Sequence, residues 1–236
     1  MSINLYLAMT AAEFSSQEEL PPKIGWMACH FSCYGTALTN LPSTLPEGSI
    51  VIVDDCTPPS GHDGQKIAAQ LSALAEQFSV SGFLLDFQRP NCEETAALAK
   101  TLVKALPCPV GVSDIYARNL SCPVFLPPPP LHKPLREYLA PWKDREIWLE
   151  AALQQEEITV TPQGSHSRFH PWEQPPEPTF YEEKLHCRYH ISVHKDSVVF
   201  SLTRDKNLLQ QWLQEAKSLG VTKAVGLYQQ LGNPEG

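Results

Sequence analysis

The sequence predicts an α/β fold, a small or irregular (β/α)8 barrel. Short apolar runs recur along the chain, and helical patterns lie between several of them. Most runs are apolar at consecutive positions, as expected for parallel strands that are covered on both faces. Eight such runs that alternate with helices indicate a closed parallel barrel.

The eight predicted strands are Ile3–Leu7, Ile24–Cys29, Ile50–Asp54, Gly82–Phe87, Val110–Ser113, Pro123–Leu126, Ile147–Ala151 and Ala224–Tyr228. Apolar side chains at helical spacing predict helices over Gln65–Phe78, Glu93–Leu106 and Asn207–Leu219. We expect Asn91 to cap the second helix, Asp205 to cap the third, and Gly220 to end the third. The link from Tyr116 to Cys122 is too short for a full helix, so we expect the barrel to be irregular there.

The segment 158–203 interrupts the alternation. It begins with a proline-rich loop, densest over 162–178, and continues with a β-hairpin whose strands are His186–Val193 and Ser197–Leu202. We therefore predict one barrel domain over 1–236, with a loop and hairpin inserted between the seventh strand and the last helix.

Composition excludes several classes of function. The formal net charge of -8 argues against nucleic-acid binding, which needs clustered lysine and arginine. No apolar run is long enough to span a membrane, and the first residues lack a basic leader. The seven cysteines are scattered, which fits reduced thiols in the cytoplasm.

Two residue sets could be considered for metal binding. Cys29, His30 and Cys33 have a loose spacing for zinc and no second pair of ligands. Asp54 and Asp55, together with the pair His62 and Asp63, would suit Mg²⁺ or Ca²⁺ better. The stronger prediction is that the chain uses no metal and no cofactor.

Polar side chains follow the predicted strands, at the end of a barrel where reacting groups lie. They are His30, Asp54, Asp55, Asp86, Gln88, Arg89, Asp114, Tyr116, Glu150, Gln229 and Gln230. Carboxylates gathered there would push their pKa values apart, which suits acid–base chemistry. The alternative for each single aspartate is that it caps the turn after its strand.

The fourth strand, Ser81-Gly82-Phe83-Leu84-Leu85-Asp86-Phe87-Gln88, resembles the strand-four signature of the family-18 glycoside hydrolases, DGxDxDxE. In this alignment Asp86 stands at the third aspartate and Gln88 at the final glutamate. The family also often inserts a mixed element after its seventh strand, where this chain inserts 158–203. The resemblance implies a chitinase-like barrel with a saccharide site at its carboxyl end.

The departures from this signature bear on activity. The resemblance makes the final glutamate the general acid, and Gln88 has no proton of suitable pKa to donate. Leu84 replaces the second aspartate, so the usual carboxylate relay is absent. Asp86 could still steer the N-acetyl group of a substrate. Tyr228 is the nearest counterpart of the aromatic platform on the eighth strand.

The sequence therefore predicts a glycoside hydrolase-like barrel that has lost or altered its catalysis and binds a saccharide or similar polar ligand. The site would comprise Asp86, Gln88, Asp114 and Glu150, with ligand contacts from Asp54, Asp55, Arg89, Tyr116, Tyr228, Gln229 and Gln230. One alternative is an active hydrolase with relocated carboxylates. Another is a protein-interaction module that uses the proline-rich segment, and the oligomeric state stays open.

Overall fold

The computed structural model describes residues 3–32, 37–59, 61–90 and 92–232. The chain separates into two compact units. We call Asn4–Pro127, Asp144–Glu150 and Thr222–Gly236 the barrel unit, and Pro128–Lys143 with Ala151–Val221 the insertion unit. The prediction of a single domain over 1–236 stays a prediction. No helix among the described residues is both long and apolar enough to cross a membrane.

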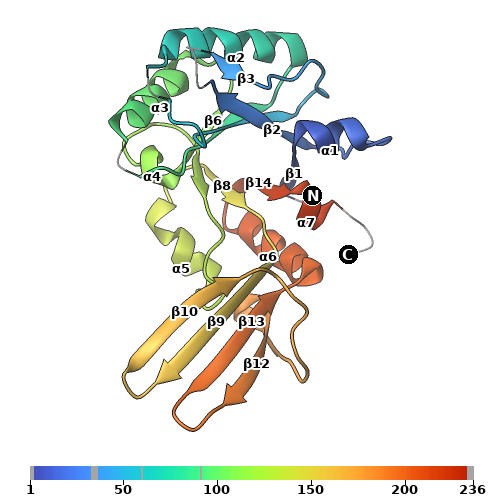
Figure 1. Ribbon diagram of the computed structural model, residues 1–236, viewed down its shortest axis with the longest axis vertical. Coiled ribbons are helices and arrows are strands. Elements are labelled where there is room, and N and C mark those ends of the chain that lie inside the picture. The colour runs from blue at the N-terminus through green and yellow to red at the C-terminus, as the bar shows by residue number, and fades with distance from the viewer. Residues whose placement is uncertain (1–2, 33–36, 60, 91, 233–236) are drawn as a thin grey trace. The chain divides into compact units, whose positions relative to one another are not determined.

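Eight parallel strands close into a barrel, which confirms the predicted fold class (Figure 1). They are β1 (Asn4–Met9), β2 (Ile24–Phe31), β4 (Ile50–Asp54), β5 (Gly82–Asp86), β6 (Val110–Ser113), β7 (Val124–Leu126), β8 (Ile147–Glu150) and β14 (Val221–Leu227). The order is β1-β14-β8-β7-β6-β5-β4-β2, and pairing of β1 with β2 closes the ring. A short strand, β3 (Leu38–Thr39), adds antiparallel to β2.

Alternate residues of each strand point into the barrel, and most of these inward residues are apolar, so the barrel core is apolar. The buried cluster comprises Tyr6, Ala8, Ile50, Ile52, Leu84, Phe125, Trp148 and Val225. Burying one such aliphatic or aromatic side chain stabilises the fold by about 1.5–3 kcal/mol. All eight strand positions predicted from the sequence are occupied by strands, with ends that shift by up to three residues.

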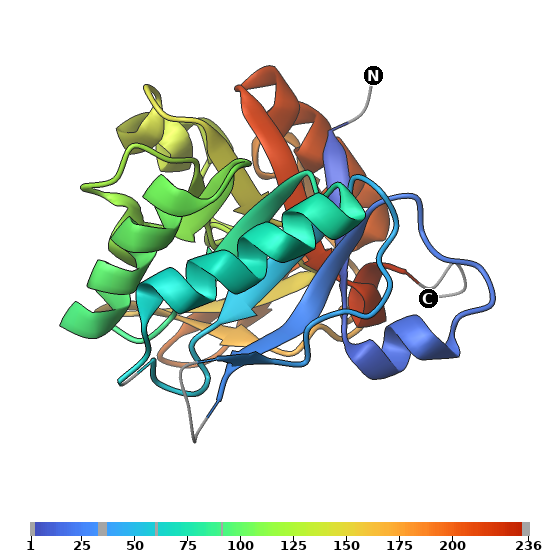
Figure 2. The ribbon, with the colours of Figure 1, turned by 90° about the horizontal axis from the view of Figure 1, so that it is seen from above.

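Helices follow the strands where the sequence supplies caps and an apolar stripe. Helix α2 (Gly64–Phe78) starts at Asp63, whose carboxylate accepts from the backbone N–H groups of Gln65 and Lys66. Helix α3 (Glu93–Ala105) starts at Cys92, whose side chain makes no capping bond, while the expected cap Asn91 lies outside the described residues. Both helices cover the outside of the barrel strands and contact each other (Figure 2).

The remaining links of the barrel unit are short, as the irregular barrel requires. Helix α1 (Ala11–Ser16) follows β1, α4 (Asp114–Ala117) follows β6, and α7 (Tyr228–Leu231) follows β14. Thr10 and Glu13 form a reciprocal capping box at the start of α1. The four-residue α4 confirms that no full helix fits between Tyr116 and Cys122.

The insertion unit contains an antiparallel sheet of five strands. These are β9 (Gln154–Thr161), β10 (Gly164–His170), β11 (Phe180–Glu182), β12 (Cys187–Val193) and β13 (Val198–Arg204), in the order β10-β9-β13-β12-β11. The predicted hairpin corresponds to β12 and β13. The expectation of a loop from residue 158 needs correction, because β9 and β10 form a second hairpin there.

Helices complete the insertion unit. They are α5 (Leu135–Leu139), the 3₁₀ helices η1 (Ala140–Trp142) and η2 (Glu183–Leu185), and α6 (Lys206–Ser218). Asp205 caps α6 by accepting from the N–H of Leu208, as predicted. Gly220 follows α6 with φ +94°, a conformation that favours glycine, so the predicted end of the helix is also confirmed.

Candidate functional site

Three polar strand ends form a row at the carboxyl end of the barrel. Parallel pairing sets His30 of β2 opposite Asp54 of β4, and Asp54 opposite Asp86 of β5. Neighbouring strands lie about 4.8 Å apart, so these side chains share one region of the barrel mouth. The apolar run of β5 ends on the acid Asp86 because the strand reaches this mouth.

Asp86 is oriented by two neighbours. The side-chain amide of Gln88 donates to Asp86 Oδ1, and the hydroxyl of Ser113 lies 3.4 Å from the same oxygen. Burial raises the pKa of Asp86, while these hydrogen bonds act to lower it and the charges of Asp54 and Asp55 act to raise it. Ser113 was not singled out from the sequence, although its place as the polar end of a predicted strand is a signal that could have found it.

Glu150 lies at the end of β8 and lines the same cavity as Asp86. The cavity measures about 70 Å³, and its other lining residues are Ala8, Met27, Ile52, Leu84, Phe125, Val225, Gly226 and Leu227. Burial among these apolar groups, with the charge of Asp86 added, raises the pKa of Glu150 to about 7. A carboxylic acid with such a pKa can hold or release a proton near neutral pH.

Asp54 is engaged with its neighbours at the mouth. Its Oδ2 lies 2.6 Å from Nδ1 of His30, and its Oδ1 accepts from the backbone N–H of Cys56 at 2.9 Å. Asp54 therefore positions the turn after β4 as well as presenting a carboxylate beside Asp86.

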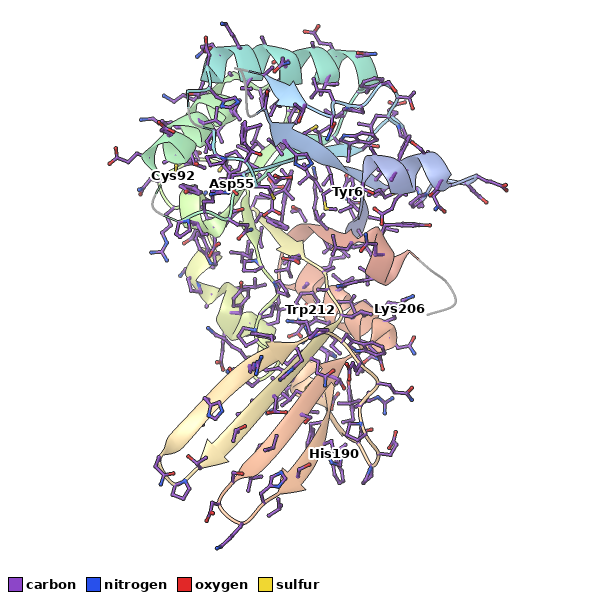
Figure 3. All side chains as sticks on the ribbon, viewed as in Figure 1. Tyr6, Asp55, Cys92, His190, Lys206 and Trp212 are labelled. Atoms are coloured by element: carbon purple, nitrogen blue, oxygen red, sulfur yellow. The ribbon has the colours of Figure 1, made fainter. Side chains whose placement is uncertain are left out.

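A buried carboxylate holds the loop after β5. Asp55, labelled in Figure 3, is 3% exposed and accepts from the backbone N–H groups of Gln88 at 2.9 Å and Arg89 at 3.0 Å. The guanidinium of Arg89 donates in return to the carbonyl oxygens of Asp55 and Cys56, at 2.7 and 2.6 Å. These bonds fix the main chain at Gln88, whose side chain is exposed.

Tyr116 ties the far side of the same loop. Its hydroxyl donates to the carbonyl oxygen of Arg89 and accepts from the backbone N–H of Cys92. Asp55, Arg89 and Tyr116, all predicted as ligand contacts, thus make bonds within the protein that hold the loop of Gln88.

The remaining predicted residues lie at the other strand ends. Asp114 is the half-buried first residue of α4. The hydroxyl of Tyr228 donates to Gln17 at 2.7 Å, and the side chain of Gln229 hydrogen-bonds Glu13. Gln230 is half-buried on α7.

Two tryptophans of the barrel unit belong to its core. Trp26 is 7% exposed and donates to the carbonyl oxygen of Asn40, while Trp148 is fully buried. Cys33, one of the residues considered for zinc, lies outside the described residues. Burial raises the pKa of the Cys29 thiol to about 12. Within the described ranges, no three His, Cys, Asp or Glu side chains are close enough to hold a metal ion.

No protein-family model matches the sequence, and no curated protein matches it either. Solved structures do match, and they show that the chain has the fold of the family-18 glycoside hydrolases. The resemblance read from the fourth strand is therefore confirmed at the level of fold.

Three structures illustrate this likeness. The spore cortex-lytic enzyme SleL of Bacillus cereus matches 95% of this chain and 70% of its own, with a TM-score of 0.56 and 10% identity. SleL of Bacillus megaterium QM B1551 has the same coverage, with a TM-score of 0.53 and 11% identity. A mutant GH18 chitinase of Cycas revoluta in complex with (GlcNAc)4 matches 95% of this chain and 94% of its own, with a TM-score of 0.55 and 10% identity.

Proposed function

We propose that this chain binds a saccharide, or a similar polar ligand, at the carboxyl end of its barrel and has lost or altered the cleavage chemistry. One observation carries the proposal. Gln88 follows β5, the fourth barrel strand, at the position where the family-18 signature has its proton-donating glutamate, and the amide of Gln88 donates to Asp86. An amide keeps the shape and hydrogen bonds of a carboxyl group but has no proton to give to a leaving group.

The loop geometry supports a role for Gln88 in binding. Its main chain is fixed by Asp55, while its side chain is exposed at the mouth and aligned by Asp86. A planar amide beside a carboxylate offers a donor and acceptors that match sugar hydroxyls. One of the two substitutions in the Cycas revoluta chitinase bound to (GlcNAc)4 replaces a glutamate by a glutamine.

We assign the ligand contacts to two groups of residues. Asp86, Gln88 and Glu150 would contact the ligand at the centre of the mouth, and Asp54, Asp114, Tyr228, Gln229 and Gln230 would lie around them. Asp55, Arg89 and Tyr116 would act by holding the loop. The described cysteines are free, which supports a cytoplasmic location.

The test compares wild type with Gln88→Glu on chitooligosaccharides and peptidoglycan fragments, measuring both binding by calorimetry and cleavage by product analysis. We expect the wild type to bind without cleaving and Gln88→Glu to gain cleavage. Gln88→Ala is the matched control, because it removes the amide without supplying an acid and should weaken binding alone. Cleavage by the wild type would overturn the proposal.

A second candidate, an active hydrolase with relocated carboxylates, is favoured by one observation. Glu150 and Asp86 line the same cavity, and the pKa of Glu150 is about 7. Glu150 would serve as the acid and Asp86 as the carboxylate that stays ionised. Wild-type cleavage that Glu150→Gln lowers by about 10²-fold or more, and that Gln88→Ala leaves intact, would establish this candidate.

A further inference from the structure

The cavity at the barrel mouth carries two carboxyl groups and no basic side chain. Asp86 and Glu150 are the titratable residues among its described lining residues, and the others are apolar side chains and a glycine. This lining therefore contains no lysine or arginine that could balance the charge. Because low-dielectric walls of one charge sign focus the electric field, such a cavity attracts positive charge.

The Glu150 carboxyl group has little that stabilises its charged form. Burial and the charge of Asp86 raise the pKa of Glu150 to about 7, and no hydrogen bond from the described residues offsets these two effects. Asp86, by contrast, accepts from the amide of Gln88 and has the hydroxyl of Ser113 at 3.4 Å. Removing a carboxylate from water without a hydrogen bond is costly, so Glu150 stands to gain most from a ligand that donates to it.

The cationic side chains near the mouth are committed elsewhere. The guanidinium of Arg89 donates to the carbonyl oxygens of Asp55 and Cys56, and Nδ1 of His30 lies 2.6 Å from Oδ2 of Asp54. Neither basic side chain lines the cavity. The positive partner of the two carboxyl groups in the cavity is therefore left for a ligand to supply.

We propose that the mouth binds an amino sugar with a free amine, a saccharide built of glucosamine units, whose ammonium group enters the cavity and contacts Asp86 and Glu150. This inference rests on the proposed saccharide site and names the class of saccharide that it takes. The cavity of about 70 Å³ suits one substituent of a sugar ring, since sites that enclose a whole ligand measure about 300–1,000 Å³. The ring then lies at the mouth, where the exposed amide of Gln88 reaches its hydroxyl groups.

The substituent at the second carbon of the ring decides the preference. An ammonium group carries positive charge and donates three hydrogen bonds, so both carboxylates can accept from it. An acetamide has a carbonyl oxygen that Asp86 repels and that could accept only from a protonated Glu150. A hydroxyl group donates one hydrogen bond and carries no charge. The cavity therefore favours the ammonium group over the other two.

The test compares three tetrasaccharides that differ at this carbon: the glucosamine tetramer (GlcN)4, (GlcNAc)4 and cellotetraose. Their binding to the intact chain is measured by titration calorimetry at about pH 7, where an amine with a pKa of about 7.7–8.0 is mostly charged. Glu150→Gln removes the charge and keeps the shape of the side chain. Glu76→Gln is the matched control, because it makes the same change at an exposed position of α2. Thermal unfolding verifies that both variants fold.

We expect the wild type and Glu76→Gln to bind (GlcN)4 at least about 10-fold more tightly than either of the other tetrasaccharides. Glu150→Gln should reduce this preference to about 3-fold or less, because it removes one of the two charges that the ammonium group meets. Added salt should weaken the binding of (GlcN)4 more than that of cellotetraose, since salt screens the attraction.

Proton release gives a second measurement of the same contact. An ammonium group beside Glu150 lowers the pKa of its carboxyl, so binding of (GlcN)4 to the wild type at about pH 7 should release a fraction of a proton. Glu150→Gln should release less. The other titratable groups of the mouth, Asp86, Asp54 and His30, are present in both proteins, so the difference belongs to Glu150. Binding heats in two buffers of different ionisation enthalpy measure it.

The outcomes separate this inference from the proposed function. Binding of (GlcNAc)4 or cellotetraose as tightly as (GlcN)4 would overturn the inference and leave the saccharide site standing. A preference that Glu150→Gln retains, or that Glu76→Gln also loses, would overturn it as well, because it would indicate general attraction to the net charge of -8. Failure of all three tetrasaccharides to bind would overturn the proposed function, and the inference with it.

Discussion

The two ends of the barrel are built from the same strands but differ in packing. Strand β5 points Gly82, Leu84 and Asp86 inward in succession, and β8 points Trp148 and then Glu150. At the amino end Trp148 fills the space beside Gly82 and Gly111. At the carboxyl end Asp86 and Glu150 leave a cavity of about 70 Å³. Inward positions are therefore filled by packed side chains at one end, and at the other end they place two carboxylates on a cavity.

The amino end is closed further by polar groups that face the aromatic rings. Nζ of Lys223 lies 4.2 Å from the Trp148 ring centroid and donates to the carbonyl oxygen of Ser81 at 3.0 Å. The hydroxyl of Tyr6 bonds the Ser81 hydroxyl at 3.0 Å. Substitutions at this end should change stability alone, whereas those at the mouth should also change ligand binding or pH dependence.

The largest effect is expected for Gly111→Ala at the amino end. A Cβ added at Gly111 would lie 2.4 Å from Cε3 of Trp148. The indole of Trp148 is fully buried, so relieving this overlap would disturb the packing around it. We expect a loss of about 3 kcal/mol in the free energy of unfolding, measured by urea denaturation. Adding Trp148→Leu to Gly111→Ala should cost less than the sum of both single changes. A loss below about 0.5 kcal/mol would show that this end is loosely packed.

A smaller loss in the free energy of unfolding is expected for Asp55→Ala at the barrel mouth. It leaves the backbone N–H groups of Gln88 and Arg89 without their acceptor, at a cost of about 2 kcal/mol. Saccharide binding should fall as well, because the main chain at Gln88 is released. Asp55→Asn keeps one acceptor oxygen and should lose about half as much stability. Unchanged binding by a folded Asp55→Ala protein would separate this loop from the site.

The pH dependence of stability tests the electrostatics of the mouth. Folding raises the pKa of Glu150 from 4.5 to about 7, so the folded state holds this proton more tightly than the unfolded chain does. The stability from this group is present below about pH 4.5 and is lost as the pH rises through about 7.

Glu150→Gln should remove this loss. After allowance for partial exposure, we expect it to raise the free energy of unfolding at about pH 8 by about 2 kcal/mol relative to wild type, and to change it little at about pH 4. Urea denaturation across this range measures the difference. A wild-type stability that is flat between these pH values would contradict the raised pKa.

The smallest effect is expected for Lys223→Met. Burial lowers the pKa of Lys223, so the folded state disfavours its charged form, while the Trp148 ring and the Ser81 carbonyl offset that cost. Methionine keeps the apolar stem, so the net change at neutral pH should stay within about 1 kcal/mol. As the pH rises from the lowered pKa of folded Lys223 towards the unfolded-state value of about 10.5, the folded wild type loses this unfavourable charge and should gain stability, whereas Lys223→Met should not. A loss above about 2 kcal/mol would show that the cation itself holds this end closed.

The barrel strands could be predicted because burial on both faces leaves an unbroken apolar run, as in Ile50–Asp54 and Val110–Ser113. The hairpin of β9 and β10 was missed because both strands are mostly polar and β10 is also largely exposed. In Gly164–His170 only Phe169 is a large hydrophobic residue, so no period of two stands out. Prolines nearby added a loop signal that belongs to the segment after β10.

At the mouth, the strand ends indicated which side chains gather but not what they bond. The row of His30, Asp54 and Asp86 follows from strand order alone. The bonds of Asp55 to the backbone of Gln88 and Arg89 depend on a loop conformation that local sequence does not encode. The raised pKa of Glu150 likewise needs the apolar lining that distant strands supply.

The Asp55 carboxylate has a consequence for how this barrel could change its chemistry. It sets the course of the loop through backbone N–H groups, which every residue type except proline carries, so the course of the loop does not depend on which side chain stands at position 88. Different side chains can therefore be exchanged at that point without rebuilding the scaffold. On the proposed function, gain or loss of a proton donor at this position would take one substitution and would leave the course of the loop unchanged.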